Sequence, residues 1–306
     1  GLHPVVVVSA MGREGQPYST VELVRTVRRI HPAIKPRELD MLMSCGEIIS
    51  TVAMAHLLRS KGYETTAFSG GQAGLITDEH YGHAHIVRIN PELLLAALQD
   101  GHMVFVAGFQ GITADHQITT LGAGGSDYTA VALTHVIRET PKLPFGEALE
   151  VEPLQIFKEV DGIMTANPSS LREDGGQPLT VPHVSYDECV SMSRLGAEVL
   201  QQQAAEMARK YHIPLVVRNF RQVDSPSTEV GLGRGHGEDD HATAIVDQPR
   251  LLVFDLDTED ARLSFQIAER LDRARLTFYR VETKEARVRF AVRPLKYRDM
   301  DSIVRG

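Results

Sequence analysis

The residues best suited to chemistry follow a glycine-rich turn in the segment LGAGGSDYTAVAL. Gly122, Gly124 and Gly125 let backbone N–H groups approach a ligand closely, and Ser126 and Asp127 are expected at the N-cap of the apolar helix that follows. Unpaired N–H groups and the helix dipole favour a phosphate or carboxylate at such a turn. The glycine spacing matches neither the dinucleotide fingerprint nor a Walker A loop, so a tight turn without a ligand is the alternative.

The second group able to do chemistry is Glu47, a carboxylate inside the apolar helix expected over residues 36–61. Burying an ionised carboxylate is costly unless it is paired. We therefore expect Glu47 to point into a polar cavity, where it can pair with an ammonium group or accept a hydrogen bond from a hydroxyl. An exposed helix glutamate is the alternative.

A parallel sheet is expected to position these groups. The apolar runs at residues 5–8 and 104–107 end in small residues, a pattern typical of buried strands whose carboxyl ends face a crevice. Ligands bind open α/β sheets at that edge. Strand and helix patterns alternate along the chain, which predicts an α/β fold, a three-layer α/β/α domain around a mainly parallel sheet. Further strands are expected at residues 63–68, 86–89, 154–160 and 213–218, and helices at residues 21–30, 91–100, 127–138 and, broken at Gly196, 185–210.

The composition favours small-molecule chemistry in the cytoplasm. A net charge of −8 and a pI near 5.9 offer no general attraction to nucleic acid or to an anionic membrane. Two cysteines do not suggest a disulfide scaffold, and neither an apolar run of ~18 residues nor a signal peptide is recognised. His80, His83 and His85 lack cysteine support and the HExxH spacing, so no metal site is expected there.

The composition changes after the last of these strands. Residues 1–221 are expected to form the main domain, and residues 222–248, rich in Gly, Ser and charge, a linker. Residues 249–306 show a strand, helix, strand, strand pattern, a βαββ unit of ~55 residues that is too small for much core of its own. Because its sheet leaves an edge and an apolar face, we expect a homodimer or heterodimer through residues 251–293.

The ordered motifs over residues 4–220 resemble those of aspartokinases of the amino-acid kinase family, including the bacterial lysine-pathway type. They are VVVVSAMGREGQPYST, LMSCGEIIS, GGQAGLIT, VFVAGFQG, TTLGAGGSDYTAVAL, VDGIMTANP, SYDECVSMSRLGAEVL and IPLVVRNF. The tail resembles an ACT-type regulatory domain more weakly. The resemblance implies the amino-acid kinase fold, transfer of the γ-phosphoryl group of ATP, with Mg²⁺, to the side chain of L-aspartate, and allosteric amino-acid binding at the tail.

The resemblance also implies roles for individual residues. Glu47 matches the carboxylate that meets the substrate ammonium, and Phe109 and Ser126 match other substrate contacts. On the nucleotide side, the matching residues form the glycine-rich segment, the acidic group beside the transferred phosphate and the nucleotide segment. They are Gly124, Gly125, Asp127, Asp161, Gly162, Met164 and Asn167.

Several motif positions depart from the family pattern. Ala123 stands where most members have the arginine of GRGGSD, and Glu198 stands where they have the lysine of GAKVLHP. Gln201 and Gln202 replace the His-Pro of that motif, and TANPS loses an acid and an arginine of TADPR. The family's KFGGT segment, with its phosphate-binding lysine, would precede Pro4 and is absent from the given sequence, so the chain is expected to be processed, truncated or lacking a start.

These departures remove positive charge that phosphoryl transfer needs. The activity of this chain is therefore expected to be weak or lost. Lys158, which replaces the threonine of the family's TDVDG, is a candidate to supply a lost cation and act with Asp127. The alternative is an inactive amino-acid sensor or a regulatory partner of an active aspartokinase. Acetylglutamate or uridylate kinase chemistry fits the segments SCGEIIS and GGSDYT poorly.

Overall fold

The computed structural model describes residues 3–140, 150–168, 177–197, 199–232, 244 and 246, and in the tail residues 252–257, 266, 269, 271, 278–284 and 287–292. The chain divides into two compact units, Gly1–Val246 and Asp247–Gly306. Each unit is described by itself.

A fully parallel sheet lies at the centre of the first unit. Its strands are β1 (Val5–Val8), β5 (Met103–Ala107) and β2 (Thr65–Phe68), in the order β1-β5-β2. Both pairings are parallel, with Val5 opposite Val104 and Thr65 opposite Met103. The carboxyl ends of the three strands therefore lie at one edge of the sheet, as the sequence predicts.

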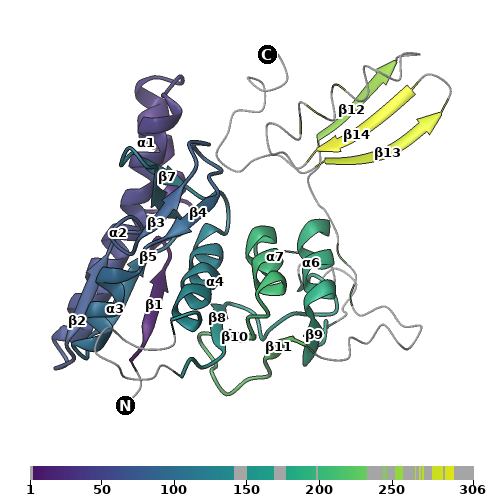
Figure 1. Cartoon of the computed structure of the whole chain (residues 1–306). Coiled ribbons are helices and arrows are strands. Elements are labelled where there is room, and N and C mark those ends of the chain that lie inside the picture. Colours follow the sequence, from purple (N-terminus) through teal and green to yellow (C-terminus); the bar gives the residue numbers. More distant parts are fainter. Residues whose placement is uncertain are drawn as a thin grey trace. The chain divides into compact units, whose positions relative to one another are not determined.

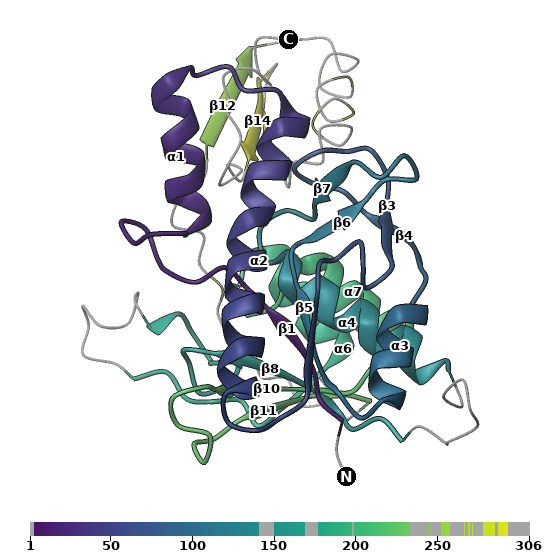
Figure 2. The same ribbon diagram turned by 90° about the vertical axis from the view of Figure 1, so that its left-hand side faces the viewer.

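Helices cover both faces of this sheet (Figures 1 and 2). Helix α2 (Pro36–Arg59) packs on one face, and α3 (Glu92–Gln99) and α4 (Gly125–Arg138) pack on the other. The alternation of side chains along β5 explains the layers. Phe105 joins the cluster on the α2 side, whereas Val104 and Val106 join the cluster of α3 and α4. The predicted three-layer α/β/α arrangement is confirmed. Helix α1 (Thr20–Ile30) precedes α2 along the chain.

A second sheet extends the parallel pattern. Strands β8 (Leu154–Lys158), β10 (Leu215–Asn219), β11 (Thr228–Gly231) and β9 (His183–Ser185) follow the order β8-β10-β11-β9. The β8-β10 and β11-β9 pairings are parallel, and β10-β11 is antiparallel. The chain runs between β9 and β10 through α6 (Tyr186–Leu195) and α7 (Gln202–Lys210). The predicted break between these helices is confirmed, since Gly196 ends α6 with φ +101°.

Three short strands were not expected from the sequence. The small-residue loop SGGQAGLIT contains β3 (Leu75–Thr77), and the polar segment ITADHQITT overlaps β6 (Gln110–Ile112) and contains β7 (Ile118–Thr120). With β4 (Ile86–Ile89) they form a sheet in the order β4-β3-β6-β7. Strands of three residues are too short to show an alternation of apolar and polar residues.

The first unit also reaches beyond its expected end. The segment 222–248, expected as a linker, contains β11, in which Thr228 and Val230 are buried. Thr228 Oγ1 accepts a hydrogen bond from Ile163 N at 2.7 Å and donates one to Val181 O at 2.6 Å. These contacts, and the pairing of β11 within the second sheet, show that the first unit extends past the expected boundary at residue 221. Because the sequence around this short strand is polar, the composition does not indicate a strand there.

Helix α2 is long and more apolar than the sequence predicts for a helix of this domain. It is 24 residues long, and by length and composition alone it is apolar enough to cross a membrane. Asp40, Ser44 and Glu47 of this helix are nevertheless buried, and Ala55 packs with β1 and β5. These contacts identify α2 as the helix that covers one face of the central sheet.

The second unit holds a sheet of its own. Strands β12 (Leu252–Asp257), β14 (Arg287–Val292) and β13 (Phe278–Lys284) lie in the order β12-β14-β13, and both pairings are antiparallel. These strands lie where the βαββ pattern expected them. The helix expected in TEDARLSFQIAERLDRA lies almost entirely outside the described residues.

A substitution at Thr228 tests the extent of the first unit. We expect Thr228→Val to lower the free energy of unfolding by about 1–3 kcal/mol, because Ile163 N and Val181 O lose their shared partner in a buried site. Denaturant unfolding measures this change. Thr26→Val, which removes an exposed hydroxyl bonded to Glu22 O, is the control and should stay within about 0.5 kcal/mol. Equal effects of the two substitutions would contradict this assignment of β11.

Candidate active site

Glu47 lies beside the carboxyl end of β1, on the buried side of α2. Its side chain is only 4% exposed. Oε1 accepts a hydrogen bond from Ala10 N at 3.2 Å, and Oε2 is buried without a partner among the described residues. One turn further along α2, Ser50 Oγ accepts from Met11 N at 2.7 Å. The chain leaving β1 is thus held on α2 by two polar side chains.

Burial raises the pKa of Glu47 to about 7, and the hydrogen bonds from backbone N–H groups offset only part of this desolvation. The geometry agrees with a buried rather than an exposed glutamate. A buried carboxylate oxygen without a partner can accept a hydrogen bond from a cationic or neutral donor. An ammonium group is the donor that would favour its ionised form most strongly.

Ser126 and Phe109 lie where β5 meets α4. A Cβ added at Gly108, directly after β5, would lie 2.7 Å from Ser126 Oγ, so the start of α4 rests on the backbone at the end of the strand. Phe109 is buried and has φ +67°, a strained value for a residue with a side chain. Its carbonyl accepts from Leu121 N at 2.8 Å, which holds β5 against the glycine-rich turn.

The start of α4 differs from expectation. Gly124, with φ +76°, is the N-cap, and no side chain caps the helix, whereas Ser126 and Asp127 lie within the first turn. A side chain at Gly124 would be strained, and its Cβ would lie 2.8 Å from Gln201 Cβ. Gln201 is itself the N-cap of α7. The N-termini of α4 and α7 therefore meet at this contact, and each presents the positive end of a helix dipole.

Lys158 and Asp127, both predicted to be catalytic, are in direct contact. Lys158 Nζ donates to the Asp127 carboxylate at 3.0 Å to Oδ1 and 2.8 Å to Oδ2. The side chains are 26% and 14% exposed, respectively. This ion pair joins the end of β8 to the first turn of α4. It places an ammonium group beside the predicted anion site.

The predicted nucleotide segment follows β8 and serves partly as structure. Asp161 Oδ1 accepts from Asn219 Nδ2 at 2.7 Å and from Ser225 Oγ at 2.9 Å. A Cβ at Gly162 would lie 2.5 Å from Thr228 Oγ1. Met164 pairs with Thr180 in an isolated bridge, and Asn167 is half-buried near the end of this described segment.

A charged cluster beside Lys158 was not predicted. Glu159 forms an ion pair with Arg13, from the loop after β1. It forms a second one with Arg221, which follows β10, at 3.6 Å from Glu159 Oε1 to Arg221 Nη2. About half or more of each of these side chains is exposed to solvent. The ion pairs therefore contribute little stability. The Nε atom of Arg218 in β10 is buried without a hydrogen-bond partner in the described part of the chain. Only the proximity of strand ends could have suggested this cluster.

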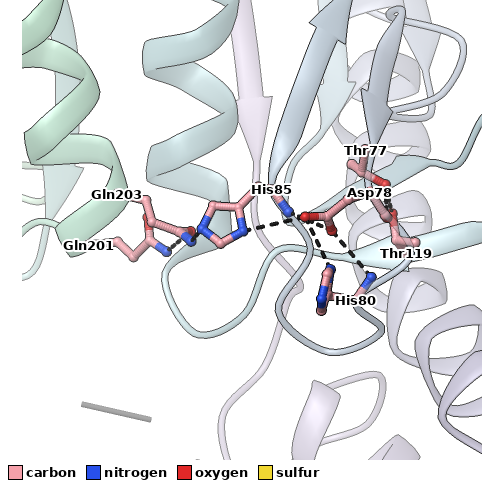
Figure 3. A network of polar contacts seen from close by, with 7 residues as sticks. All are labelled: Thr77, Asp78, His80, His85, Thr119, Gln201 and Gln203. Carbon is pink, nitrogen blue, oxygen red and sulfur yellow. Dashed lines mark hydrogen bonds and ion pairs between the residues drawn. The ribbon is translucent and has the colours of Figure 1, made fainter. Parts of the chain in front are cut away.

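A polar network that includes Gln201, which contacts Gly124 of the glycine-rich turn, was not predicted (Figure 3). Asp78 Oδ2 lies 3.2 Å from His80 Nδ1 and 3.6 Å from His85 Nδ1. On the other side of the ring, His85 Nε2 lies 2.7 Å from Gln203 Nε2. Gln203 Oε1 accepts from Gln201 Nε2 at 2.7 Å. The spacing of these histidines in the sequence bears only on a metal site, which it does not favour. No group of three or more His, Cys, Asp or Glu side chains able to hold a metal is found in the portion of the chain that the structure describes.

The helices around a parallel sheet and the anion-favouring turn at its edge define an α/β protein with a candidate phosphate site. The family model "Amino acid kinase family" matches residues 1–219, and the chain belongs to this family.

Its sequence relatives include aspartokinases. The chain is 40% identical to Aspartokinase 1 of Bacillus subtilis over 219 residues, which is 72% of this chain and 50% of that protein. It is 40% identical to the aspartokinase of Mycolicibacterium smegmatis over 231 residues, 75% of this chain and 50% of that one. The chain spans about half the length of the curated relatives it matches.

Solved structures show the same fold. Aspartate kinase from Synechocystis matches 95% of this chain and 47% of its own, with a TM-score of 0.59 and 27% identity. E. coli aspartokinase III, solved with aspartate and ADP, matches 89% of this chain and 59% of its own, with a TM-score of 0.63 and 21% identity. The amino-acid kinase fold implied by the resemblance is thus confirmed.

The raised pKa of Glu47 predicts how stability depends on pH. The folded protein keeps the Glu47 proton up to about pH 7, whereas the unfolded chain loses it near the ordinary value of 4.5. The Glu47 carboxyl therefore does not lower the free energy of unfolding below about pH 4.5, and it lowers it increasingly as the pH rises to about 7. We expect Glu47→Gln to stabilise the protein by up to about 3 kcal/mol at pH 8 and by much less at pH 4.5. Denaturant unfolding at the two pH values checks this, and a difference independent of pH would contradict it.

Proposed function

We propose that this chain binds L-aspartate and phosphorylates its side-chain carboxylate from ATP, forming 4-phospho-L-aspartate, at a rate lowered by the loss of phosphate-binding charge. The observation that carries the proposal is the ion pair of Lys158 with Asp127 on the first turn of α4. It puts a cation at the turn where the family motif has lost its arginine, at Ala123. Membership of the amino acid kinase family and similarity to aspartokinases support the choice of reaction.

On the substrate side, Glu47 is proposed to receive the ammonium group of the amino acid. Oε2, which has no partner among the described residues, provides the acceptor, and the burial of Glu47 strengthens the pairing by excluding water. Ser126 and Phe109 border the same edge of the sheet and are proposed as further substrate contacts.

On the nucleotide side, the meeting N-termini of α4 and α7 suit an anion, so the residues present fit a phosphate group. Gly124, Gly125 and Lys158 would hold the phosphates, and the nucleotide segment with Asp161, Gly162, Met164 and Asn167 would contact the rest of the nucleotide. ATP supplies the transferable phosphoryl group when bound. Mg²⁺ is proposed to enter with the phosphates, as it commonly does, rather than to occupy a protein cage.

The charge available to the phosphates is smaller than in the family motif. Ala123 is exposed on the turn and contributes none. Glu198, which replaces the motif lysine, lies outside the described residues. Lys158 is shared with Asp127, which lowers the positive charge it can offer. We therefore propose weak activity, because electrostatic stabilisation is the main contribution of the protein to phosphoryl transfer.

A second candidate function is an inactive amino-acid sensor or a regulatory partner of an active aspartokinase. It is favoured by the contrast between Glu47, whose Oε2 is available for a ligand, and Lys158, already engaged by Asp127. For either function we propose a cytoplasmic protein that dimerises through the ACT-like tail, residues 249–306.

Hydroxamate trapping of aspartyl phosphate distinguishes the two candidates. With ATP, Mg²⁺ and L-aspartate, we expect product above the no-enzyme level, and Lys158→Met should lower the rate roughly 10- to 100-fold because a charge-assisted phosphate contact is lost. Lys61→Met, which removes an exposed lysine beyond α2, is the matched control and should retain the rate. No product, together with thermal stabilisation by L-aspartate, would establish the sensor instead. If neither is seen, both candidates fail.

The pH dependence of L-aspartate binding tests the role of Glu47. The free protein holds Glu47 protonated below about pH 7, and an ammonium ligand requires the ionised form. We expect the affinity for L-aspartate to fall by up to about tenfold for each pH unit below 7. Calorimetric titration between about pH 5.5 and about pH 8, a range that brackets the pKa of Glu47, measures the slope. Glu47→Gln should abolish both the tight binding and the slope, and a slope that survives it would argue against Glu47.

A further inference from the structure

We propose that a chain of three side chains, His85, Gln203 and Gln201, is a positioning element for the glycine-rich turn, and so for phosphate binding. This inference rests on the proposed function. None of the three residues belongs to the site residues that the sequence predicts. Gln201 occupies a position where the chain departs from the family motif.

The chain of contacts runs from β3 to the start of α7. Asp78, directly after β3, accepts from His85 N at 3.1 Å, and its Oδ2 lies 3.6 Å from His85 Nδ1. A proton on Nδ1, facing the carboxylate, leaves Nε2 as an acceptor. Gln203 Nε2 can then donate to His85 Nε2 across the 2.7 Å that separates them. Figure 3 shows these side chains in line.

The chain continues to the N-cap of α7. Gln203 Oε1 accepts from Gln201 Nε2 at 2.7 Å, and Gln201 Oε1 accepts from Ala204 N at 3.2 Å. Each glutamine thus uses its amide as donor and acceptor at once. An apolar side chain of the same size at position 203 would break both links. The orientation of Gln201 is therefore set by residues on both sides of it.

The same elements hold the turn at two points. Gly124 lies against Gln201, since a Cβ there would be 2.8 Å from Gln201 Cβ, and Gly122 lies against His83, since a Cβ there would be 2.6 Å from His83 Nδ1. His83 and His85 belong to one loop, and Ala84 N between them donates to Thr120 O at 2.9 Å. The turn is held directly by this loop at Gly122 and through Gln203 and Gln201 at Gly124.

This arrangement implies a preorganised anion site. Backbone N–H groups bind a phosphate well only when their directions are fixed before the ligand arrives. The Cα and Cβ atoms of Gln201 fill the space beside Gly124, and the side-chain links fix the register of the α7 N-terminus against that of α4. Loosening these links should weaken phosphate binding without removing any group that touches the phosphate.

The test compares two adjacent glutamines in the full chain. Gln203→Met breaks the chain of contacts at similar side-chain size. Gln202→Met is the matched control, because Gln202 Nε2 donates to Glu206 Oε1 at 3.0 Å within α7. Amide hydrogen exchange of residues 121–127 in the unliganded protein should become roughly fivefold faster in Gln203→Met and stay unchanged in Gln202→Met. His85→Phe, which cuts the chain at its other end, should reproduce the effect if Gln203→Met folds poorly.

Binding of MgADP gives the second readout. We expect Gln203→Met to bind MgADP roughly tenfold more weakly, while the thermal stabilisation by L-aspartate stays as in the wild type. Unchanged exchange in both Gln203→Met and His85→Phe would overturn the positioning role, as would an equal effect of Gln202→Met. If the exchange changes as expected but the wild type binds no MgADP, the proposed nucleotide function fails while the coupling to the turn stands.

Discussion

The arrangement of the site depends on one steric constraint, the contact of Ser126 with the backbone of Gly108. A Cβ at position 108 would overlap the serine, so only glycine lets α4 begin directly on the end of β5. Because β5 pairs with β1 in the parallel sheet, this contact places α4 next to β1 as well. Glu47 reaches the same edge from the opposite face through Ala10, and Lys158 reaches it through Asp127.

The two sides of the site differ in how their charge is balanced. Glu47 is a carboxylate in an apolar helix, and one of its oxygens has no partner in the part of the chain that the structure describes; its raised pKa reflects the cost of burial. Asp127 has a cationic partner in contact with both oxygens. A ligand that brings a positive charge would relieve the first side, whereas an anionic ligand must share the cation of the second. This difference is the physical basis for proposing amino-acid binding with slow phosphoryl transfer.

Much of the fold could be read from the sequence because its long elements carry clear periodic signals. Helix α2, the strand at residues 103–107 and the break at Gly196 are defined by side chains that act locally. Strands β3, β6, β7 and β11 were missed, since three or four residues with few large apolar side chains carry little periodic signal and gain their stability from the strands they pair with.

Of the site, individual residue types were predictable, and their partners were not. A carboxylate inside an apolar helix suggests burial, and a lysine at the end of a strand suggests an anion. The pairing of Lys158 with Asp127, the cap at Gly124 and the glutamine chain depend on how α4, α7 and β8 approach one another. No local pattern encodes these distances.

The order of strands in the second sheet has a consequence for how the chain folds as it is synthesised. Strand β9 pairs with β11 rather than with β10, although β10 follows it first along the chain. Among the described strands β11 is the partner of β9, so on the ribosome β9 and the following helix α6 lack that partner until Thr228–Gly231 has emerged. The closing step of this sheet is a long-range pairing, which folds more slowly than local contacts. A nascent chain arrested before β11 would expose an unpaired strand edge, the feature by which incomplete α/β chains aggregate.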